Sequence, residues 1–296
     1  MPTIEREDFG DFSVLHRTPN GGEEITVHFA HATGFNAETY RPLLESMDPT
    51  IDLRLMDARG HGRTTAEANP RRLHSWDRYR RDLQAYVESL RQPVVLAGHS
   101  MGGTVSMQVA AKRPDLVRGL VLIDPVIFPP RLVPLAMVAR TLGFSRRILP
   151  IVGAAARRRM EFPSKEAAVE NYVGKGPFRT WERSWIEAYV EGGTVATEDG
   201  AVRLSCDSAW EARTFAVATV NPYRLLRQVR CPITLFARVH DGPPFTTASR
   251  EAFMRCKPDT RLHVLEDVTH FMAMERPDIV VDEVERMADA VRSELR

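Results

Sequence analysis

The sequence lacks the features that mark disulfide-stapled, zinc-bound and membrane-spanning proteins. It holds only three cysteines in 296 residues, Cys206, Cys231 and Cys256, and they are widely spaced. An odd number of scattered cysteines fits neither a disulfide framework nor a zinc cluster. No apolar run approaches the roughly 20 residues that a membrane-spanning helix needs. We therefore expect a cytoplasmic protein with reduced thiols and no stable insertion into a membrane.

The sequence also lacks a large excess of charge of either sign. Forty basic residues stand against 39 acidic ones, which leaves a net charge of +1 and argues against a chain-wide nucleic-acid surface. The first residues are charged and lack the apolar core of a signal peptide. With 43% hydrophobic and 27% charged residues, the composition is that of a globular protein, which excludes disorder, collagen and coiled coil.

What the chain does contain is a regular alternation of strands and helices in its first 125 residues. Short β-rich, largely apolar runs occur at residues 25–30, 51–56, 94–97 and 120–123. An apolar stripe with helical spacing lies between the second and third of them, over residues 76–90. Strands that alternate with helices indicate βαβ units. The sequence thus predicts an α/β fold with a mostly parallel central sheet flanked by helices.

The alternation stops at Pro125 and resumes far along the chain. Strand patterns return at residues 233–237 and 261–265, and a final helix begins near Pro277. The stretch between has no β-rich run of comparable strength. We expect residues 1–125 and 215–296 to form the core domain, and residues 126–214 to form an inserted helical segment over it.

The insertion carries a strongly basic run. Between residues 131 and 165 there is one anion, Glu161, against eight cations: Arg131, Arg140, Arg146, Arg147, Arg157, Arg158, Arg159 and Lys165. The run favours either an anionic substrate or a helix that touches a lipid surface. A solvated face with acidic partners elsewhere on the fold is the third interpretation.

The strongest chemical signal is the segment Gly98-His-Ser-Met-Gly-Gly103, directly after one predicted strand and before a helical stretch. A strand–Gly-x-Ser-x-Gly–helix turn forces strained backbone angles on the serine and presents its oxygen at the edge of the sheet. The small neighbours Gly98 and Gly102 relieve crowding. We expect Ser100 to be a nucleophile.

A serine hydroxyl needs a base, and the base needs an orienting partner. His270 follows the strand at residues 261–265 in a loop ahead of the final helix, at an edge where parallel sheets place their chemistry. We expect His270 to be the base. His61, in a tight turn, and His99, beside the serine, are expected to be structural.

Two aspartates could orient His270. Asp241 lies just beyond the strand at residues 233–237, and Asp124 ends the strand at residues 120–123. Spacing alone cannot place a hydrogen bond. We favour Asp241 because it gives the chain order Ser, Asp, His with the acid after the insertion, and keep Asp124 as the alternative acid. The alternative role for Asp124 is a cap on the segment that follows.

Acyl transfer also needs backbone amides that face the developing oxyanion. Met101 supplies one, as the residue after the nucleophile. The second is expected from the loop after residues 25–30, where Thr33 is our choice and Gly34 or Phe35 are the alternatives. A plain strand-to-helix turn is the competing interpretation of this loop.

Together these segments resemble the α/β-hydrolase fold family over most of the chain. The matching parts are His31–Gly34, Asp57–Arg63, Gly98–Gly103, Asp241 and His270. The resemblance implies that the insertion is a helical cap, or lid, and that Asp57–Arg63 supports the site without taking part in catalysis. A serine at position 100, where the dehalogenase and epoxide-hydrolase branches have aspartate, argues against those branches.

The resemblance implies a serine hydrolase that acts on a carboxylic ester or related acyl bond of a small molecule through an acyl-enzyme, with no cofactor and no metal. A hydrophobic moiety in the substrate would suit the aromatic residues of the insertion, although these could equally form the insertion's own core. The aromatic residues of the insertion include Phe144, Phe162, Tyr172, Phe178, Trp181, Trp185 and Tyr189.

Lactone opening, thioester cleavage, C–C bond hydrolysis and acyl transfer to another acceptor all use the same triad. A non-catalytic ligand-binding member of the fold is a further alternative. A dinucleotide-binding oxidoreductase would need a glycine where Ser100 stands. The oligomeric state stays open.

Overall fold

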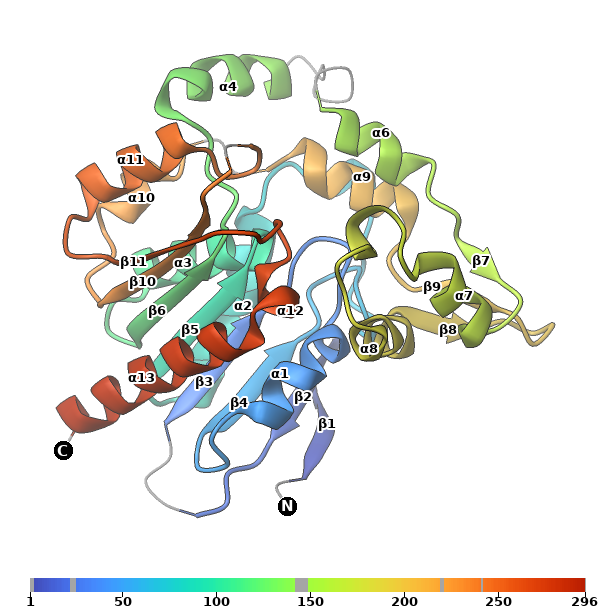
Figure 1. The fold of residues 1–296 in the computed structure, drawn as a ribbon, viewed down its shortest axis with the longest axis horizontal. Coiled ribbons are helices and arrows are strands. Elements are labelled where there is room, and N and C mark those ends of the chain that lie inside the picture. Colours follow the sequence, from blue (N-terminus) through green and yellow to red (C-terminus); the bar gives the residue numbers. More distant parts are fainter. Residues whose placement is uncertain (1–2, 22–24, 142–148, 219–220, 241, 296) are drawn as a thin grey trace.

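The computed structural model describes residues 3–21, 25–141, 149–218, 221–240 and 242–295, and its centre is an eight-stranded sheet (Figure 1). The strand order is β1-β2-β4-β3-β5-β6-β10-β11. The strands are β1 (Ile4–Phe9), β2 (Phe12–Arg17), β3 (Thr26–Ala30), β4 (Asp52–Met56), β5 (Val94–His99), β6 (Val117–Ile123), β10 (Ile233–Arg238) and β11 (Arg261–Leu265). All neighbouring pairs from β4 to β11 are parallel, and only the pairs β1–β2 and β2–β4 are antiparallel. The α/β fold with a mostly parallel sheet is confirmed.

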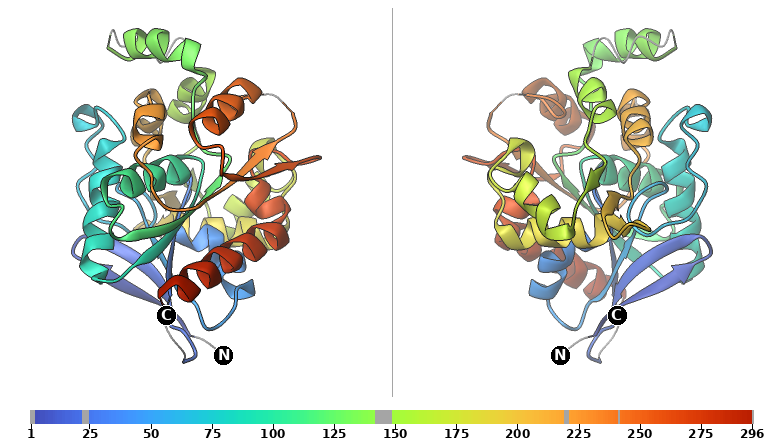
Figure 2. Two further views of the ribbon diagram at one scale, coloured as in Figure 1. Left: turned by 90° about the vertical axis from the view of Figure 1, so that its left-hand side faces the viewer. Right: turned by 90° about the vertical axis from the view of Figure 1, so that its right-hand side faces the viewer.

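Helices cover both faces of this sheet, which explains why its central strands are apolar without alternation. In β5, Val95 and Ala97 belong to one buried cluster, whereas Val94 and Leu96 belong to the other. The helices on the first face are α1 (Arg41–Ser46), α12 (Met272–Glu275) and α13 (Pro277–Leu295); those on the second are α2 (Asp77–Leu90), α3 (Met101–Lys112), α10 (Tyr223–Leu226) and α11 (Thr247–Cys256). Figure 2 shows the two layers edge-on.

The hairpin of β1 and β2 precedes the first strand that the sequence pattern indicates. Charged residues dominate β1, whose outer side chains are exposed because it is the edge strand. β2 joins the hairpin to the parallel strands through its antiparallel pairing with β4. A polar edge strand lacks the apolar run that made the other strands recognisable.

The residues between β6 and β10 form a mixed layer rather than a purely helical one. The elements are η3 (Pro130–Leu132), α4 (Val133–Thr141), α6 (Pro150–Ala156), β7 (Glu161–Phe162), α7 (Lys165–Tyr172), η4 (Gly176–Phe178), α8 (Arg183–Gly193), β8 (Thr194–Ala196), β9 (Val202–Leu204) and α9 (Ser208–Ala216). The strands β7, β9 and β8 pair into a small separate sheet. With two or three residues each, they are too short to give a periodic signal.

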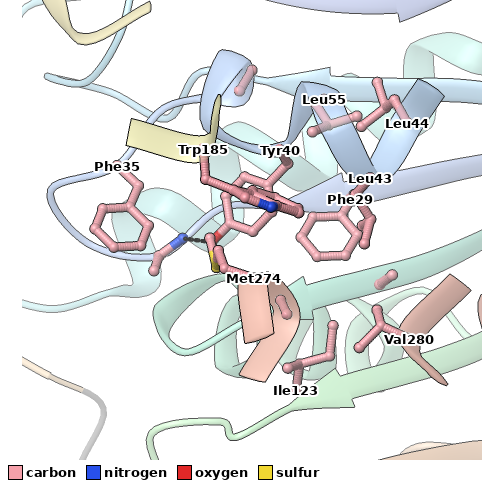
Figure 3. Close-up of a cluster of buried hydrophobic side chains, with 14 of the residues drawn as sticks. Phe29, Phe35, Tyr40, Leu43, Leu44, Leu55, Ile123, Trp185, Met274 and Val280 are labelled. Atoms are coloured by element: carbon pink, nitrogen blue, oxygen red, sulfur yellow. Dashed lines mark hydrogen bonds between the residues drawn. The ribbon is translucent and has the colours of Figure 1, made fainter. Parts of the chain in front are cut away.

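The insertion rests on the core chiefly through α8, which packs against the short helix η1 (Ala37–Tyr40). Trp185 of α8 lies beside Tyr40 in a buried cluster (Figure 3). The Asn36 side chain donates a hydrogen bond to the Tyr189 carbonyl at 3.0 Å. A Cβ atom on Gly192 would lie 2.3 Å from Asn36 Oδ1, so a glycine is needed for the two segments to approach this closely. The insertion is thereby held over the carboxyl ends of the parallel strands (Figure 1).

Two further expectations concern disulfide bonds and membrane-spanning helices. The three cysteines Cys206, Cys231 and Cys256 are free. Among the helices that the structure describes, none combines the length and apolarity required to cross a bilayer.

Candidate active site

Ser100 stands at the turn between β5 and α3 in a strained backbone conformation. Its φ of 56° and ψ of −117° lie in a region that side-chain-bearing residues rarely adopt. A Cβ on Gly98 would come within 2.5 Å of the Gly102 carbonyl carbon, and a Cβ on Gly102 within 2.1 Å of the Ala30 oxygen. The two glycines are therefore required by backbone packing, as the sequence pattern indicates. The Ser100 side chain faces a cavity.

His270 lies in the loop between β11 and α12 and bridges two groups. Its Nε2 is 3.0 Å from Ser100 Oγ, and its Nδ1 is 2.6 Å from Asp124 Oδ2. Because an ionised carboxylate only accepts hydrogen bonds, we assign the ring proton to Nδ1. Nε2 is then left with a free lone pair that accepts the hydroxyl proton of Ser100. The expected pairing of Ser100 with His270 is thus present in the geometry.

The structure departs from the preference for Asp241: the partner that accepts the hydrogen bond of His270 Nδ1 is Asp124, the alternative acid. Asp124 follows β6 directly, is fully buried and has a positive φ of 40°. Its N–H donates to the Phe236 carbonyl of β10 at 3.0 Å, which fixes the turn. Asp241 itself lies outside the described residues.

The end of β10 contributes a cation to this site. Arg238 Nε lies 3.0 Å from Asp124 Oδ2, at ion-pair distance, and the guanidinium is mostly buried. The carboxylate that orients His270 thus has a partner of opposite charge behind it. No motif identified Arg238. The signal available for Asp124 was its place at the end of the strand that follows the nucleophile's helix, since a βαβ unit sets β6 beside β5.

His99 has a positioning role that the sequence analysis did not specify. Its Nε2 is 2.8 Å from the backbone oxygen of His270, and its Nδ1 is 2.8 Å from the Tyr40 hydroxyl. A carbonyl only accepts, so Nε2 carries the proton and Nδ1 accepts from Tyr40. The Tyr40 oxygen accepts in turn from the Ala32 N–H at 3.2 Å. This chain of hydrogen bonds ties the loop after β3 to the loop that holds His270.

Burial keeps these supporting histidines neutral. The pKa of His99 is held well below its ordinary value by burial and by the neighbouring His270. Burial likewise lowers the pKa of His31, whose Nε2 accepts the Ala58 N–H at 2.9 Å. Burial is also the main reason that the pKa of His61 falls to about 3. The expectation that His61 is structural agrees with its enclosed position.

Of the expected oxyanion donors, Thr33 lies against Met101 and lines the cavity. The Thr33 hydroxyl is 3.3 Å from Met101 Sδ, and Thr33 lines the same cavity as Ser100. The Phe35 N–H already donates to the Ala32 carbonyl at 3.1 Å. Gly34 has a positive φ of 78°, and a Cβ there would clash with Glu211. The geometry therefore favours Thr33 and Met101 over Phe35.

The segment Asp57–Arg63 supports this loop from below, as the resemblance implied. Asp57 accepts hydrogen bonds from the N–H groups of Ala37 at 2.7 Å and Arg63 at 2.9 Å. It also forms an ion pair with Arg6 of β1 at 2.7 Å. Asp57 is fully buried and is satisfied on several sides, so it fixes loop conformation and has no access to the cavity.

A cavity of about 430 Å³ opens above Ser100 and His270. Its size is within the range of small-molecule sites. The core and the insertion both line it, as does Phe215 of α9; the lining residues of the insertion are Ile151, Ala154, Ala155, Arg158, Asn171, Tyr172, Lys175, Gly176, Pro177, Phe178, Tyr189 and Glu211. Of the seven aromatics singled out from the sequence, Tyr172, Phe178 and Tyr189 face this cavity. Phe162, Trp181 and Trp185 are buried in the hydrophobic core, and Phe144 lies outside the described residues.

The cations of the basic run differ in exposure and in the direction of their side chains. Arg131, Arg157 and Arg159 are exposed, whereas Arg158 turns inward and lines the cavity. Arg146 and Arg147 lie outside the described residues. Within the part of the chain that the structure describes, no cluster of histidine, cysteine and carboxylate side chains has the arrangement of a metal site.

The fold and these side chains define a hydrolase of the α/β type, and comparison with known proteins agrees. Residues 29–283 match the model of the alpha/beta hydrolase family. The chain belongs to this family.

Three relatives illustrate the likeness. The chain is 25% identical over 286 residues to a 2-(acetamidomethylene)succinate hydrolase from Mesorhizobium japonicum, with 96% of this chain and 95% of the relative covered. It is 30% identical to the mouse (Mus musculus) monoglyceride lipase over 117 residues, 37% of each chain. The crystal structure of an E-2-(acetamidomethylene)succinate hydrolase superposes with a TM-score of 0.76 at 22% identity, covering 98% of this chain and all (100%) of that one.

Proposed function

We propose that this protein hydrolyses carboxylic esters of small molecules by a Ser100–His270–Asp124 triad and an acyl-enzyme intermediate. The observation that carries the proposal is the continuous hydrogen-bonded path from Ser100 Oγ to His270 at 3.0 Å and on to Asp124 at 2.6 Å. A hydroxyl, an imidazole and a buried carboxylate in this order are the parts that activate a serine.

In the first half of the reaction, Ser100 Oγ attacks the ester carbonyl while His270 Nε2 takes the hydroxyl proton. Asp124 holds the ring and stabilises its positive form, and Arg238 forms an ion pair with Asp124. The N–H groups of Met101 and Thr33 stabilise the negative oxygen of the tetrahedral intermediate. His270 then gives the proton to the departing alcohol, and the acyl group stays on Ser100.

In the second half, a water molecule takes the place of the alcohol. His270 removes its proton, the resulting hydroxide attacks the acyl carbon, and a second tetrahedral intermediate collapses to release the acid and restore Ser100. His99 and Tyr40 hold the backbone of His270 during both proton transfers, and burial prevents His99 from competing as a base.

The direct test replaces the nucleophile. Ser100→Ala should lower kcat on an activated ester by a factor on the order of 10⁶, because the acyl-enzyme can no longer form. Ser106→Ala is the matched control, since Ser106 lies on α3, buried under the same strand. Near-wild-type turnover by Ser100→Ala would refute the mechanism.

A fluorophosphonate probe tests whether the protein is an enzyme at all. Mass spectrometry should find the probe on Ser100 in the wild type and on Ser106→Ala, and not on Ser100→Ala. A wild type that takes up no probe would favour a non-catalytic, ligand-binding role.

The bond that is cleaved is the finer question, because lactones, thioesters, C–C bonds and acyl transfer to other acceptors use the same triad. Ester hydrolysis is the proposal that the similarity to the monoglyceride lipase supports. A panel of esters, lactones and thioesters of equal chain length should give the highest kcat/KM for the esters, and a higher value for another class would replace ester hydrolysis as the reaction.

A further inference from the structure

Arg158 is a buried cation in the wall of the cavity that holds Ser100. It follows α6, its side chain is 17% exposed, and it lies among groups from three other elements of the insertion. Its guanidinium donates to Glu211 Oε2 at 3.0 Å, to the Tyr172 hydroxyl at 3.2 Å and to the Tyr189 hydroxyl. The guanidinium carbon also lies 5.8 Å and 5.7 Å from the centres of the two tyrosine rings. These contacts fix the direction in which the guanidinium points.

The guanidinium lines the same cavity as Ser100 and His270 and lies beside the loop after β3. A Cβ on Gly34 would be 3.6 Å from Arg158 Nη1 and 2.2 Å from Glu211 Oε1. Gly34 follows Thr33, whose N–H we assign to the oxyanion. Arg158 therefore lies beside the loop that carries the expected oxyanion donor, in the wall of the same cavity.

The charges along the cavity do not cancel. Among its described lining residues, Arg158 and Lys175 are cations and Glu211 is an anion, which leaves an excess of one positive charge. Glu211 and the two tyrosines engage three of the five N–H donors of the guanidinium. Glu211 and Tyr172 raise the pKa of Arg158 against the opposing effect of burial, so the group stays charged.

The remaining walls of the cavity are mostly apolar, which strengthens the binding of a charged ligand group. Phe35, Phe178, Phe215 and Phe271 line the cavity with apolar surface. A charge–charge contact is stronger in such surroundings than at an open surface. The two N–H donors of Arg158 that remain, one on Nε and one on Nη1, can each donate a charge-assisted hydrogen bond to a carboxylate.

We propose that Arg158 binds an ionised carboxylate of the substrate, so that the substrates are esters that carry a second, free carboxylate near the reacting carbonyl. This inference rests on the proposed function. It explains why one arginine of the basic run turns inward while its two neighbours in sequence are exposed. Lys175, which donates a hydrogen bond to the Glu170 carbonyl at 3.4 Å, lines the same cavity and adds attraction for the anion.

The test compares esters that differ in one carboxylate. Monomethyl succinate, glutarate and adipate are paired with methyl butyrate, valerate and hexanoate, and 4-carboxyphenyl acetate is paired with its methyl ester, which places the charge on the alcohol side. Release of acid is followed by pH-stat titration near neutral pH. In at least one pair, we expect the wild type to show a kcat/KM about 10² higher for the carboxylate-bearing ester.

Variants connect this preference to Arg158. Arg158→Gln should lower kcat/KM for the preferred carboxylate ester by between about 30-fold and about 10³-fold, and for its uncharged partner by less than about threefold. Arg157→Gln removes the same charge from the exposed neighbour and should keep the preference. Because Arg158 also joins parts of the insertion, thermal unfolding of each variant is measured, and the ratio of the two esters within one variant removes the effect of reduced folding.

Each outcome bears on one proposal. Equal or faster hydrolysis of the uncharged esters by the wild type would overturn the substrate class and leave the triad intact, as would an unchanged preference in Arg158→Gln. Hydrolysis of no ester in the set, with Ser100 still labelled by a fluorophosphonate, would overturn the substrate class as well. Absence of both hydrolysis and labelling would overturn the proposed function itself.

Discussion

The strand edge that holds Ser100 and the insertion that covers it are constructed differently. Around Ser100 the backbone itself fills the space, since Gly98 and Gly102 each face main-chain atoms that cannot move aside. In the insertion, the cavity wall consists of side chains, and Gly153 of α6 faces only the flexible end of Arg157. The reaction is therefore fixed by contacts that tolerate no added atom, whereas the choice of substrate depends on side chains that single substitutions can exchange.

The largest effect should come from the acid of the core. Asp124→Asn should lower kcat by about 10⁴, because an amide no longer holds His270 in the required tautomer. Asp241→Asn, the change that chain order would have favoured, should leave kcat within a few-fold of wild type. Steady-state kinetics on one activated ester decide between the two acids, and the reverse result would return the role to Asp241.

The second-largest effect should come from methyl groups added in the two regions, which should change the free energy of unfolding in opposite directions. Gly102→Ala places a Cβ 2.1 Å from the Ala30 oxygen and should lower the free energy of unfolding by about 3 kcal/mol or more. Gly153→Ala lies in a helix with room for a Cβ and should raise it by up to about 1 kcal/mol. Urea unfolding measures both, and equal effects of the two changes would contradict the difference between strand edge and insertion.

Acidification should lower the stability of the core, whereas the charge on Arg158 of the insertion should not change. Burial lowers the pKa of His28 and of His61 to about 3, below the value of about 6.5 in the unfolded chain, so the unfolded state binds more protons. Stability from these groups is present above pH 6.5 and is lost as the pH falls toward 3. At about pH 5.5, each should lower the free energy of unfolding by about 1 kcal/mol.

His16, on β2, should have the opposite effect on how stability changes with pH. Burial opposes protonation of His16, but Asp52 and Glu7 outweigh it and raise its pKa. Its contribution is therefore present at acid pH and is lost as the pH rises through the raised value. Relative to wild type, His61→Gln should weaken the loss of stability on acidification and His16→Gln should deepen it. Urea unfolding at about pH 7.5 and about pH 5.5 checks both signs, and an unchanged pH dependence in His61→Gln would refute this account.

The smallest effect should come from the hydrogen bonds that join the two loops of the site. Tyr40→Phe leaves the Ala32 N–H and His99 Nδ1 without a partner and should cost about 1 to 3 kcal/mol of stability, with a decrease in kcat of less than about tenfold. Tyr223→Phe, which removes a hydroxyl bonded to the Phe128 carbonyl, is the control and should leave kcat unchanged. Equal kcat values for the two variants would show that Tyr40 acts on stability alone.

Much of this could be predicted from local patterns, because the features concerned are local. The central strands are apolar on both faces, and the turn that holds Ser100 is encoded in the six consecutive residues Gly98–Gly103. The hairpin of β1 and β2 and the small sheet β7-β9-β8 could not be predicted, since the first is polar and the second is too short to show a period. The predicted limits of the insertion stay a prediction, although α9 extends to Ala216, two residues beyond the expected limit.

The sequence by itself determined that Ser100 stands in a strained turn and that a histidine near the end of the chain follows a strand, because both depend on neighbours within a few residues. Only the tertiary structure decided which aspartate reaches His270, that Arg238 stands behind it, that His99 holds its backbone, and that Arg158 turns into the cavity. These are contacts between strands and loops up to 171 residues apart, and sequence spacing does not determine distances across a sheet.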